Sequence, residues 1–269
     1  MIRKPAVAGQ FYPSDPHLLK KLITSFGCKP PGQRAKVIAC ILPHAGYIYS
    51  GKVAAEVVSQ IGIGETCIVL GPNHTGYGVP ASIMSEGEWQ TPLGILKIDT
   101  TVARELLKNS TYLKEDALAH IYEHSIEVQL PLIQELSRKD FTFVPIVLAT
   151  DEDLVYKDIA GAIAKTVRNS KKNITIIASS DMTHYETQKS ANAKDEEAIK
   201  AILDLNEKEL LEKVDRLQIS MCGTMPVTIA ILAAKELGAK KAQLIAYQTS
   251  GDITGDYSSV VGYAGIIIQ

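Results

Sequence analysis

The sequence has no long apolar run, no cluster of basic residues and no closely spaced pair of cysteines. Its 269 residues carry a net charge of −2, and no stretch approaches the roughly 18 consecutive apolar residues of a membrane-spanning helix. Without a basic cluster, a general affinity for nucleic acid or for an anionic membrane is not expected. The first residues also lack the apolar core of a signal peptide. We therefore expect a cytoplasmic protein that binds neither nucleic acid nor membrane.

The four cysteines do not form a C-x-x-C metal motif. Cys40 and Cys67 lie inside apolar runs and are interpreted as small core residues. Cys222 differs, because it stands just before residues 224–237, which are apolar nearly all round and should form a buried helix that Gly238 ends. Unpaired N–H groups at a helix N-terminus favour a thiolate. From this pattern alone, an inert buried cysteine is an equally good interpretation.

Apolar β-branched runs alternate with amphipathic segments along the chain. Residues 36–42, 66–70 and 174–178 are typical of strands buried on both faces, whereas residues 151–168 repeat apolar side chains at helical spacing. This alternation predicts an α/β fold, with three α-β-α layers around a central mixed sheet. No change in composition divides the chain, so we expect a single domain over residues 1–269.

Four local predictions concern the segments around these strands. The first 35 residues, including Pro30-Pro31-Gly32, should form an arm with a helix near residues 16–26, capped by Ser14 or Asp15. A helix should cover residues 51–61. Residues 81–85 and 95–99 should pair as a β-hairpin. Residues 123–137 should form one helix, in which Pro131 could introduce a kink.

Three of the six histidines each follow a separate apolar run. They are His44 after residues 37–42, His74 in the glycine-rich segment 71–78, and His184 shortly after residues 174–178. Ligands of open α/β sheets bind outside the carboxyl ends of the strands, so neighbouring strands would bring these imidazoles to one edge. One histidine alone says little, because histidine has many structural roles. Segment 71–78 lacks the Lys-Ser/Thr ending of a P-loop, which argues against nucleotide binding.

Further polar residues are candidates for the same site. Asp181 could bind a metal, orient a histidine or cap the segment that follows it. His124 and Glu127 are three residues apart and would share one face of a helix, so they could point into the same cleft.

A competing motif is present at residues 120–124. His120-Ile121-Tyr122-Glu123-His124 matches the H-x-x-E-H pattern of inverted zinc peptidases. On a helix it would place both histidines on one face with Glu123 as the base, and Glu196 or Glu197 could add a third ligand. We favour this interpretation less, because so short a pattern recurs by chance.

A set of short motifs extends from residue 8 to residue 264. The motifs are Ala8-Gly9-Gln10-Phe11-Tyr12-Pro13, Pro43-His44-Ala45-Gly46-Tyr47 with Tyr49-Ser50-Gly51, Gly71-Pro72-Asn73-His74, Thr91-Pro92-Leu93-Gly94, Glu123-His124-Ser125-Ile126-Glu127 with Leu130-Pro131, Ser179-Ser180-Asp181 with His184, Cys222-Gly223, and Val260-Val261-Gly262-Tyr263-Ala264. Together they resemble the Memo family (mediator of cell motility), which includes the Memo-like proteins of the AmmeMemoRadiSam system. That family is similar in fold to the class III extradiol, LigB-like, ring-cleaving dioxygenases.

The resemblance implies a metal site. His44 and His74 fall where those dioxygenases place their two iron-binding histidines, and His184 resembles their acid–base histidine. Their third ligand is a glutamate, and Cys222 stands at or near its place. Two histidines and a carboxylate suit Fe(II), whereas a thiolate favours softer metals such as Cu(I) or Zn(II).

Two hypotheses follow from these observations. The first is a metal-dependent, dioxygenase-like redox enzyme acting on an unknown small molecule, with His44, His74 and Cys222 binding Fe(II), or alternatively Cu or Zn. In this hypothesis His184 moves protons, Asp181 lies near the metal, and His124 and Glu127 position the substrate or support the ligands. The second is a non-catalytic scaffold that binds a peptide or small ligand on the same fold. The resemblance further implies a radical-SAM protein and an Ammecr-type protein as partners.

Overall fold

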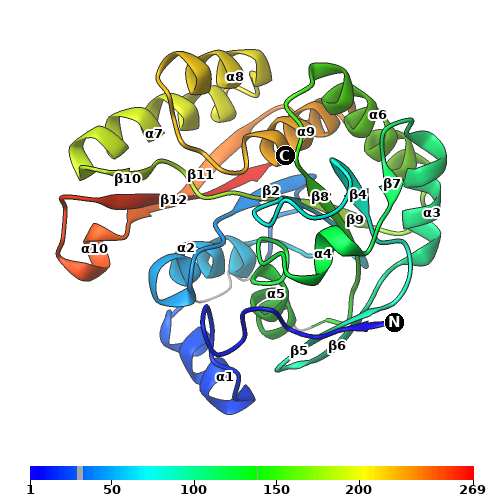
Figure 1. Cartoon of the computed structure of the whole chain (residues 1–269), viewed down its shortest axis with the longest axis horizontal. Coiled ribbons are helices and arrows are strands. Elements are labelled where there is room, and N and C mark those ends of the chain that lie inside the picture. Colours follow the sequence, from blue (N-terminus) through cyan, green and yellow to red (C-terminus); the bar gives the residue numbers. More distant parts are fainter. Residues whose placement is uncertain (29–32, 138) are drawn as a thin grey trace.

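The apolar runs form the strands of one large mixed sheet (Figure 1). The structure is a computed structural model that describes residues 1–28, 33–137 and 139–269, so Pro30-Pro31-Gly32 of the predicted arm lie outside the described residues. The strands run in the order β10 (His184–Glu186), β12 (Val260–Ile268), β2 (Ala39–Leu42), β9 (Ile174–Ser179), β3 (Thr66–Pro72), β8 (Thr142–Leu148), β4 (Ala81–Ile83) and β7 (Lys114–Glu115), and β11 (Ala242–Thr249) also pairs with β12.

The centre of the sheet is parallel. Strand β9 lies between β2 and β3, and β3 pairs with β8, all in parallel register. Every residue of β2, β3 and β9 is buried, which is why these strands read as unbroken apolar runs in the sequence. Their carboxyl ends therefore meet at one edge of the sheet, where the predicted histidines follow.

Helices cover both faces of the sheet, which confirms the predicted three-layer α/β architecture (Figure 1). One face carries α1 (Pro16–Ser25), α2 (Tyr47–Gln60) and α5 (Gln129–Ser137); the other carries α3 (Thr100–Asn109), α6 (Asp153–Asn169), α7 (Gln188–Leu203), α8 (Glu207–Arg216) and α9 (Thr224–Glu236). Two single-turn helices, α4 (Leu118–Ile121) and α10 (Gly251–Thr254), complete the described helices. In the described ranges, no helix is both long and apolar enough to span a bilayer.

The second strand of the predicted hairpin forms close to residues 95–99, but its partner is not residues 81–85. Strand β4 joins the large sheet by pairing antiparallel with β8, whereas β5 (Glu88–Thr91) and β6 (Gly94–Lys97) form the hairpin, with β1 (Ile2–Arg3) beside β5. Trp89 and Thr91 alternate in burial with their neighbours, as in a half-buried strand. Gly94, at a φ of 135°, follows the Pro92-Leu93 turn. The sequence pattern alone did not show that residues 81–83 pair with β8 in the large sheet rather than with a hairpin partner.

Two helix starts also differ from prediction. Helix α2 begins at Tyr47 rather than Gly51. Gly51 lies inside the helix, and a glycine is needed there because a Cβ would come within 2.7 Å of the Phe26 ring. Helix α5 begins only at Gln129, so Pro131 stands in its first turn, where a missing N–H is tolerated and no kink is needed. By contrast, α1 matches its prediction closely, with Asp15 capping two N–H groups.

Candidate metal centre

The loops after β2, β3 and β9 converge on one pocket of about 640 Å³. The structure brings together six of the seven predicted site residues in its lining: His44, His74, His124, Asp181, His184 and Cys222. The ring centroids of His44 and His74 are 5.2 Å apart, and His124 lies 4.5 Å from His74. Phe11, Tyr49 and Tyr263 supply apolar wall. The carboxyl edge of the sheet thus gathers four histidines, a carboxylate and a thiol.

The tautomer of His44 follows from its hydrogen bonds. The Ser179 hydroxyl donates to the carbonyl of Ser125 at 2.6 Å, so its oxygen accepts from Gln129 Nε2 at 2.8 Å and from His44 Nδ1 at 2.9 Å. Nδ1 of His44 therefore carries the proton, and Nε2 keeps its lone pair. That Nε2 lies 3.2 Å from the Cys222 sulfur. Burial, with His124 and His74 nearby, holds the pKa of His44 well below its usual value, so the ring is neutral.

His74 is oriented by Glu123. Its Nδ1 lies 2.9 Å from the Glu123 carboxylate, which also accepts the backbone N–H groups of His74, His124 and Ser125 at 2.6–2.9 Å. Burial raises the pKa of Glu123, but the hydrogen bonds from His74 and from the backbone outweigh it and bring that pKa to about 2. Because Glu123 is a carboxylate, His74 donates through Nδ1 and leaves the Nε2 lone pair free, as metal-binding histidines do.

His44, His74 and Cys222 fit a metal ion. Their ligand atoms all lie within 4.8 Å of one another. An ion bonded at about 2.1 Å to nitrogen and 2.3 Å to sulfur would hold such atoms about 3.4–3.7 Å apart. Cys222 precedes Gly223, the N-cap of α9. Burial and the nearby Asp181 raise the pKa of the Cys222 thiol, so binding an ion would release its proton.

A second set, His74, Glu123 and His124, meets the same distance criterion. Glu123 already accepts from four N–H groups, which is about the capacity of a carboxylate. We therefore assign Glu123 to orienting His74 rather than to binding an ion. His124 stacks against His74 and lies 4.8 Å from the Phe11 ring. Burial lowers its pKa to about 4, so it is a neutral ring in the pocket wall.

Asp181 and His184 complete the chemistry of the pocket. Asp181 accepts the backbone N–H of His44 at 2.7 Å, and its own N–H points to the Cys222 sulfur at 3.3 Å. Burial raises the pKa of Asp181 to about 6, despite the opposing hydrogen bond from His44. His184 Nδ1 lies 2.9 Å from the carbonyl of Ser220. A carbonyl can only accept, so Nδ1 carries the proton and Nε2 can take up another one.

Glu127 does not line the pocket. Its buried carboxylate accepts from Arg3 at 2.5 Å, from the Ala6 and Val7 N–H groups, and from the Tyr12 hydroxyl. Since α5 begins at Gln129, the prediction that Glu127 and His124 share a helix face is wrong. Glu127 instead ties the N-terminal arm to the loop that carries Glu123 and His124.

The zinc-peptidase interpretation is also wrong. His120 belongs to α4, which ends at Ile121, so His120 and His124 are not on one helix. His120 is buried with Nε2 on the Ser82 hydroxyl, and Glu197 on α7 pairs with Lys213. The motif lacks the single helix that its chemistry needs.

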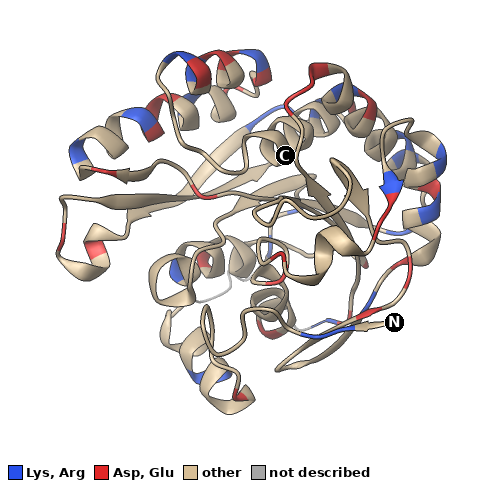
Figure 2. Ribbon diagram, viewed as in Figure 1, with Lys and Arg blue, Asp and Glu red and all other residues tan. Residues whose placement is uncertain are grey.

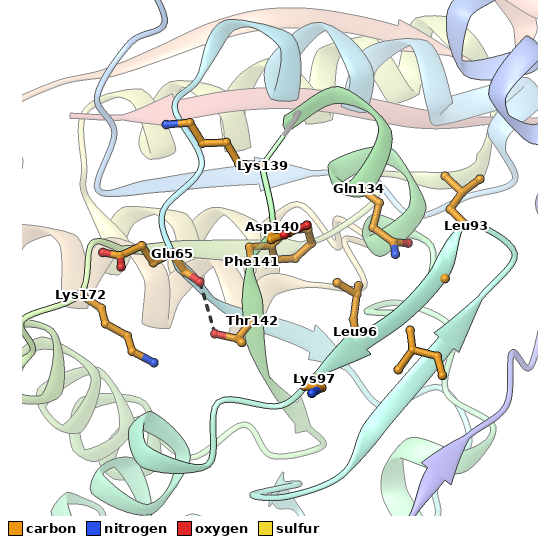
Figure 3. A pocket seen from close by; sticks show the side chains of 12 residues that line it. Glu65, Leu93, Leu96, Lys97, Gln134, Lys139, Asp140, Phe141, Thr142 and Lys172 are labelled. Atoms are coloured by element: carbon orange, nitrogen blue, oxygen red, sulfur yellow. Dashed lines mark hydrogen bonds between the residues drawn. The ribbon is translucent and has the colours of Figure 1, made fainter.

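Another cavity, of about 680 Å³, lies at the opposite ends of the central strands, where they begin (Figure 3). Glu65 and Thr142 line it where β3 and β8 begin, whereas the histidines follow strand ends. Lys97, Lys139 and Lys172 also line it, and the described lining contains no histidine or cysteine. It therefore offers no ligand set like that of the histidine pocket.

Sequence reasoning did not assign Ser179, Gln129 or Glu123 the orienting roles seen here. Ser179 and Gln129 fix His44, and Glu123 fixes His74 from 49 residues away. Of the three, only Glu123 stands beside a candidate histidine in the sequence, and it was interpreted as the base of a peptidase.

Comparison with known proteins finds relatives over nearly the whole chain. A family model described as "Memo-like protein" matches residues 3–267. A MEMO1 family protein of Aquifex aeolicus is 44% identical over 99% of this chain and 98% of its own length. The MEMO1 family protein MJ0403 of Methanocaldococcus jannaschii is 46% identical over 100% and 99%.

A solved structure shares the fold at low identity. It is the uncharacterized protein JW3007 of Escherichia coli K12, with a TM-score of 0.55, 14% identity, and coverage of 85% of this chain and 98% of that one. It supports the α/β architecture alone. The family model and the relatives together show that the chain belongs to the Memo family.

Proposed function

We propose that the protein binds a transition-metal ion through His44, His74 and Cys222 and is a redox enzyme for a small molecule. One observation carries this proposal: hydrogen bonds to Ser179 and Glu123 hold the Nδ1 protons of His44 and His74, which leaves two Nε2 lone pairs beside a thiol. Such outer hydrogen bonds are what metal-binding histidines need to keep one tautomer and one orientation.

Fe(II) is the first choice of metal, with Cu and Zn as alternatives. The fold is similar to that of the class III extradiol dioxygenases, whose iron has two histidine ligands and a carboxylate. When bound, such an ion supplies open positions for oxygen and substrate. Here the thiolate of Cys222 would replace the carboxylate, and a thiolate also suits copper or zinc.

The other pocket residues have separate roles in this proposal. His184 accepts or returns a proton at Nε2, because Ser220 holds its Nδ1 proton. Asp181 holds the backbone at His44 and the position of the Cys222 sulfur. His124, packed between His74 and Phe11, positions the substrate. Glu127 supports His124 by anchoring its loop to the N-terminal arm.

Metal binding is tested by anaerobic titration of the purified protein with Fe(II), Cu(I) and Zn(II), together with its metal content as isolated. We expect one ion per chain, and loss of binding in the His44→Ala, His74→Ala and Cys222→Ser variants. The matched controls are His17→Ala and Cys28→Ser, since His17 is exposed and neither residue lines the pocket. Equal micromolar affinity in wild type and the His44→Ala variant would refute the proposed ligand set.

Catalysis is tested by oxygen consumption of the metal-loaded protein with a panel of small molecules. We expect His184→Gln to retain the ion but lose oxygen-dependent turnover. A loaded wild type that retains a peptide and turns over none of the panel would favour the non-catalytic scaffold instead. The radical-SAM and Ammecr-type partners stay predictions, which co-purification can test.

A further inference from the structure

Strand β11 leaves one edge of the large sheet open. It is eight residues long and, among the described strands, pairs only with β12, through Ala242 to Thr249. In the part of the chain that the structure describes, no other backbone or side-chain group hydrogen-bonds to the backbone of residues 242–248. An edge strand directs half of its N–H and C=O groups outward, so β11 presents a row of unpaired groups.

The ends of the sheet elsewhere are protected in ways that β11 is not. Strand β7 has two residues, both charged, and β10 has three residues with a register shift. Short strands, charges and bulges are devices that prevent edge-to-edge pairing. Strand β11 reads Ala-Gln-Leu-Ile-Ala-Tyr-Gln-Thr, without a charge, and Figure 2 shows it tan along its length. Its one irregularity lies between Leu244 and Ala246.

Most side chains of β11 are only partly covered. Leu244, Ile245 and Tyr247 are half-buried against the core, and Gln243 is exposed. Helices α2 and α7 contact the strand from the two faces of the sheet (Figure 1). A neighbour added in the plane of the sheet would cover the remaining surface and pair the backbone.

We propose that β11 pairs antiparallel with β11 of a second copy of this chain, so that two sheets join into one. The charges at the ends of the strand identify this occupant. Exposed Lys240 and Lys241 precede β11, and exposed Asp252 follows it. In a two-fold antiparallel pair the start of one strand lies beside the end of the other, so lysines meet aspartate twice. No like charges face each other, because the strand between has none.

The test is the mass in solution of the full chain, by light scattering after size exclusion and by sedimentation equilibrium. We expect a concentration-dependent dimer. The variant Gln243→Lys/Ala246→Lys places four lysines across the shared edge and should raise the dissociation constant at least tenfold. Neither side chain packs on the core. Thr111→Lys, exposed near the other edge of the sheet, is the charge control and should leave the dimer unchanged.

Hydrogen exchange of wild-type amides 242–248 provides a second readout that needs no variant. We expect protection of the outward-facing amides to rise between about 1 and several hundred micromolar protein. A monomer at all concentrations overturns the proposal, and so does a dimer that the double-lysine variant retains. Protection that appears only when an extended peptide is added would mean that another chain occupies this edge, and would likewise overturn it.

Discussion

The pair Arg3–Glu127 gives the sharpest stability prediction. Both side chains are buried, with 3% and 1% of their surface exposed, and Nη1 of Arg3 lies 2.5 Å from the Glu127 carboxylate. Arg3 also donates to the carbonyls of His120 and Glu123 and lies 4.1 Å above the Trp89 ring. Removing one partner of a buried pair leaves an uncompensated charge, which costs about 3–5 kcal/mol.

We therefore expect Arg3→Ala to lower the free energy of unfolding by about 3–5 kcal/mol, a large part of a typical total of about 5–15 kcal/mol. The remaining donors to Glu127, from Ala6, Val7 and Tyr12, favour the lower half of that range. The double variant Arg3→Met/Glu127→Leu should lose less than the sum of its single variants, because it leaves no unpaired charge.

Urea unfolding followed by circular dichroism measures these differences. Arg104→Ala is the matched control, because Arg104 pairs with Glu86 at 3.5 Å while both are about 70% exposed. An exposed pair contributes about 0–1 kcal/mol, so this variant should stay close to wild type. A loss below about 1 kcal/mol for Arg3→Ala would refute the argument that the arm is anchored by a buried charge.

Three further predictions concern the site and its surroundings. Glu123→Gln should weaken metal binding about 10–100-fold in an anaerobic titration, because His74 loses its orienting carboxylate, while Glu86→Gln should change nothing. Burial and the charge of Arg3 lower the pKa of His120 to about 3, so only the unfolded chain takes up this proton below about pH 6.5. Stability should then fall by about 1.4 kcal/mol per pH unit as the pH drops toward 3, and urea midpoints of His120→Gln should lack this part of the slope. Gly223→Ala should destabilise the protein by at least about 1–3 kcal/mol in thermal unfolding, since a Cβ there would lie 2.4 Å from the carbonyl oxygen of Ser179; a wild-type transition would contradict this contact.

The sequence was sufficient to predict the layers and the edge at which the histidines lie. Strands β2, β3 and β9 are buried on both faces, so they are apolar along their length and can be recognised from the sequence alone. The order β2-β9-β3 could not be predicted, because the apolar runs are similar and nothing in their sequences specifies which of them pair. From the sequence, the proximity of His44 and His74 could only be assumed. It results from the order of the strands that precede them.

Failures occurred where one buried side chain determines the backbone. Residues 123–128 have a helical pattern but form a loop, in which the Glu123 carboxylate accepts hydrogen bonds from N–H groups of that loop and of His74. That partner is 49 residues away, beyond any local pattern. Glu127 was misplaced for the same reason, since its partners Arg3 and Tyr12 lie more than a hundred residues earlier.

Nε2 of His44 and the sulfur of Cys222 lie 3.2 Å apart in the pocket, although their residues are 178 positions apart in the chain. During synthesis the first of them leaves the ribosome long before the second exists. Strands β3, β8 and β9 are therefore synthesised before the proposed ligand set is complete. Binding of the proposed ion by all three residues would consequently be a late event, after the second half of the chain has been made.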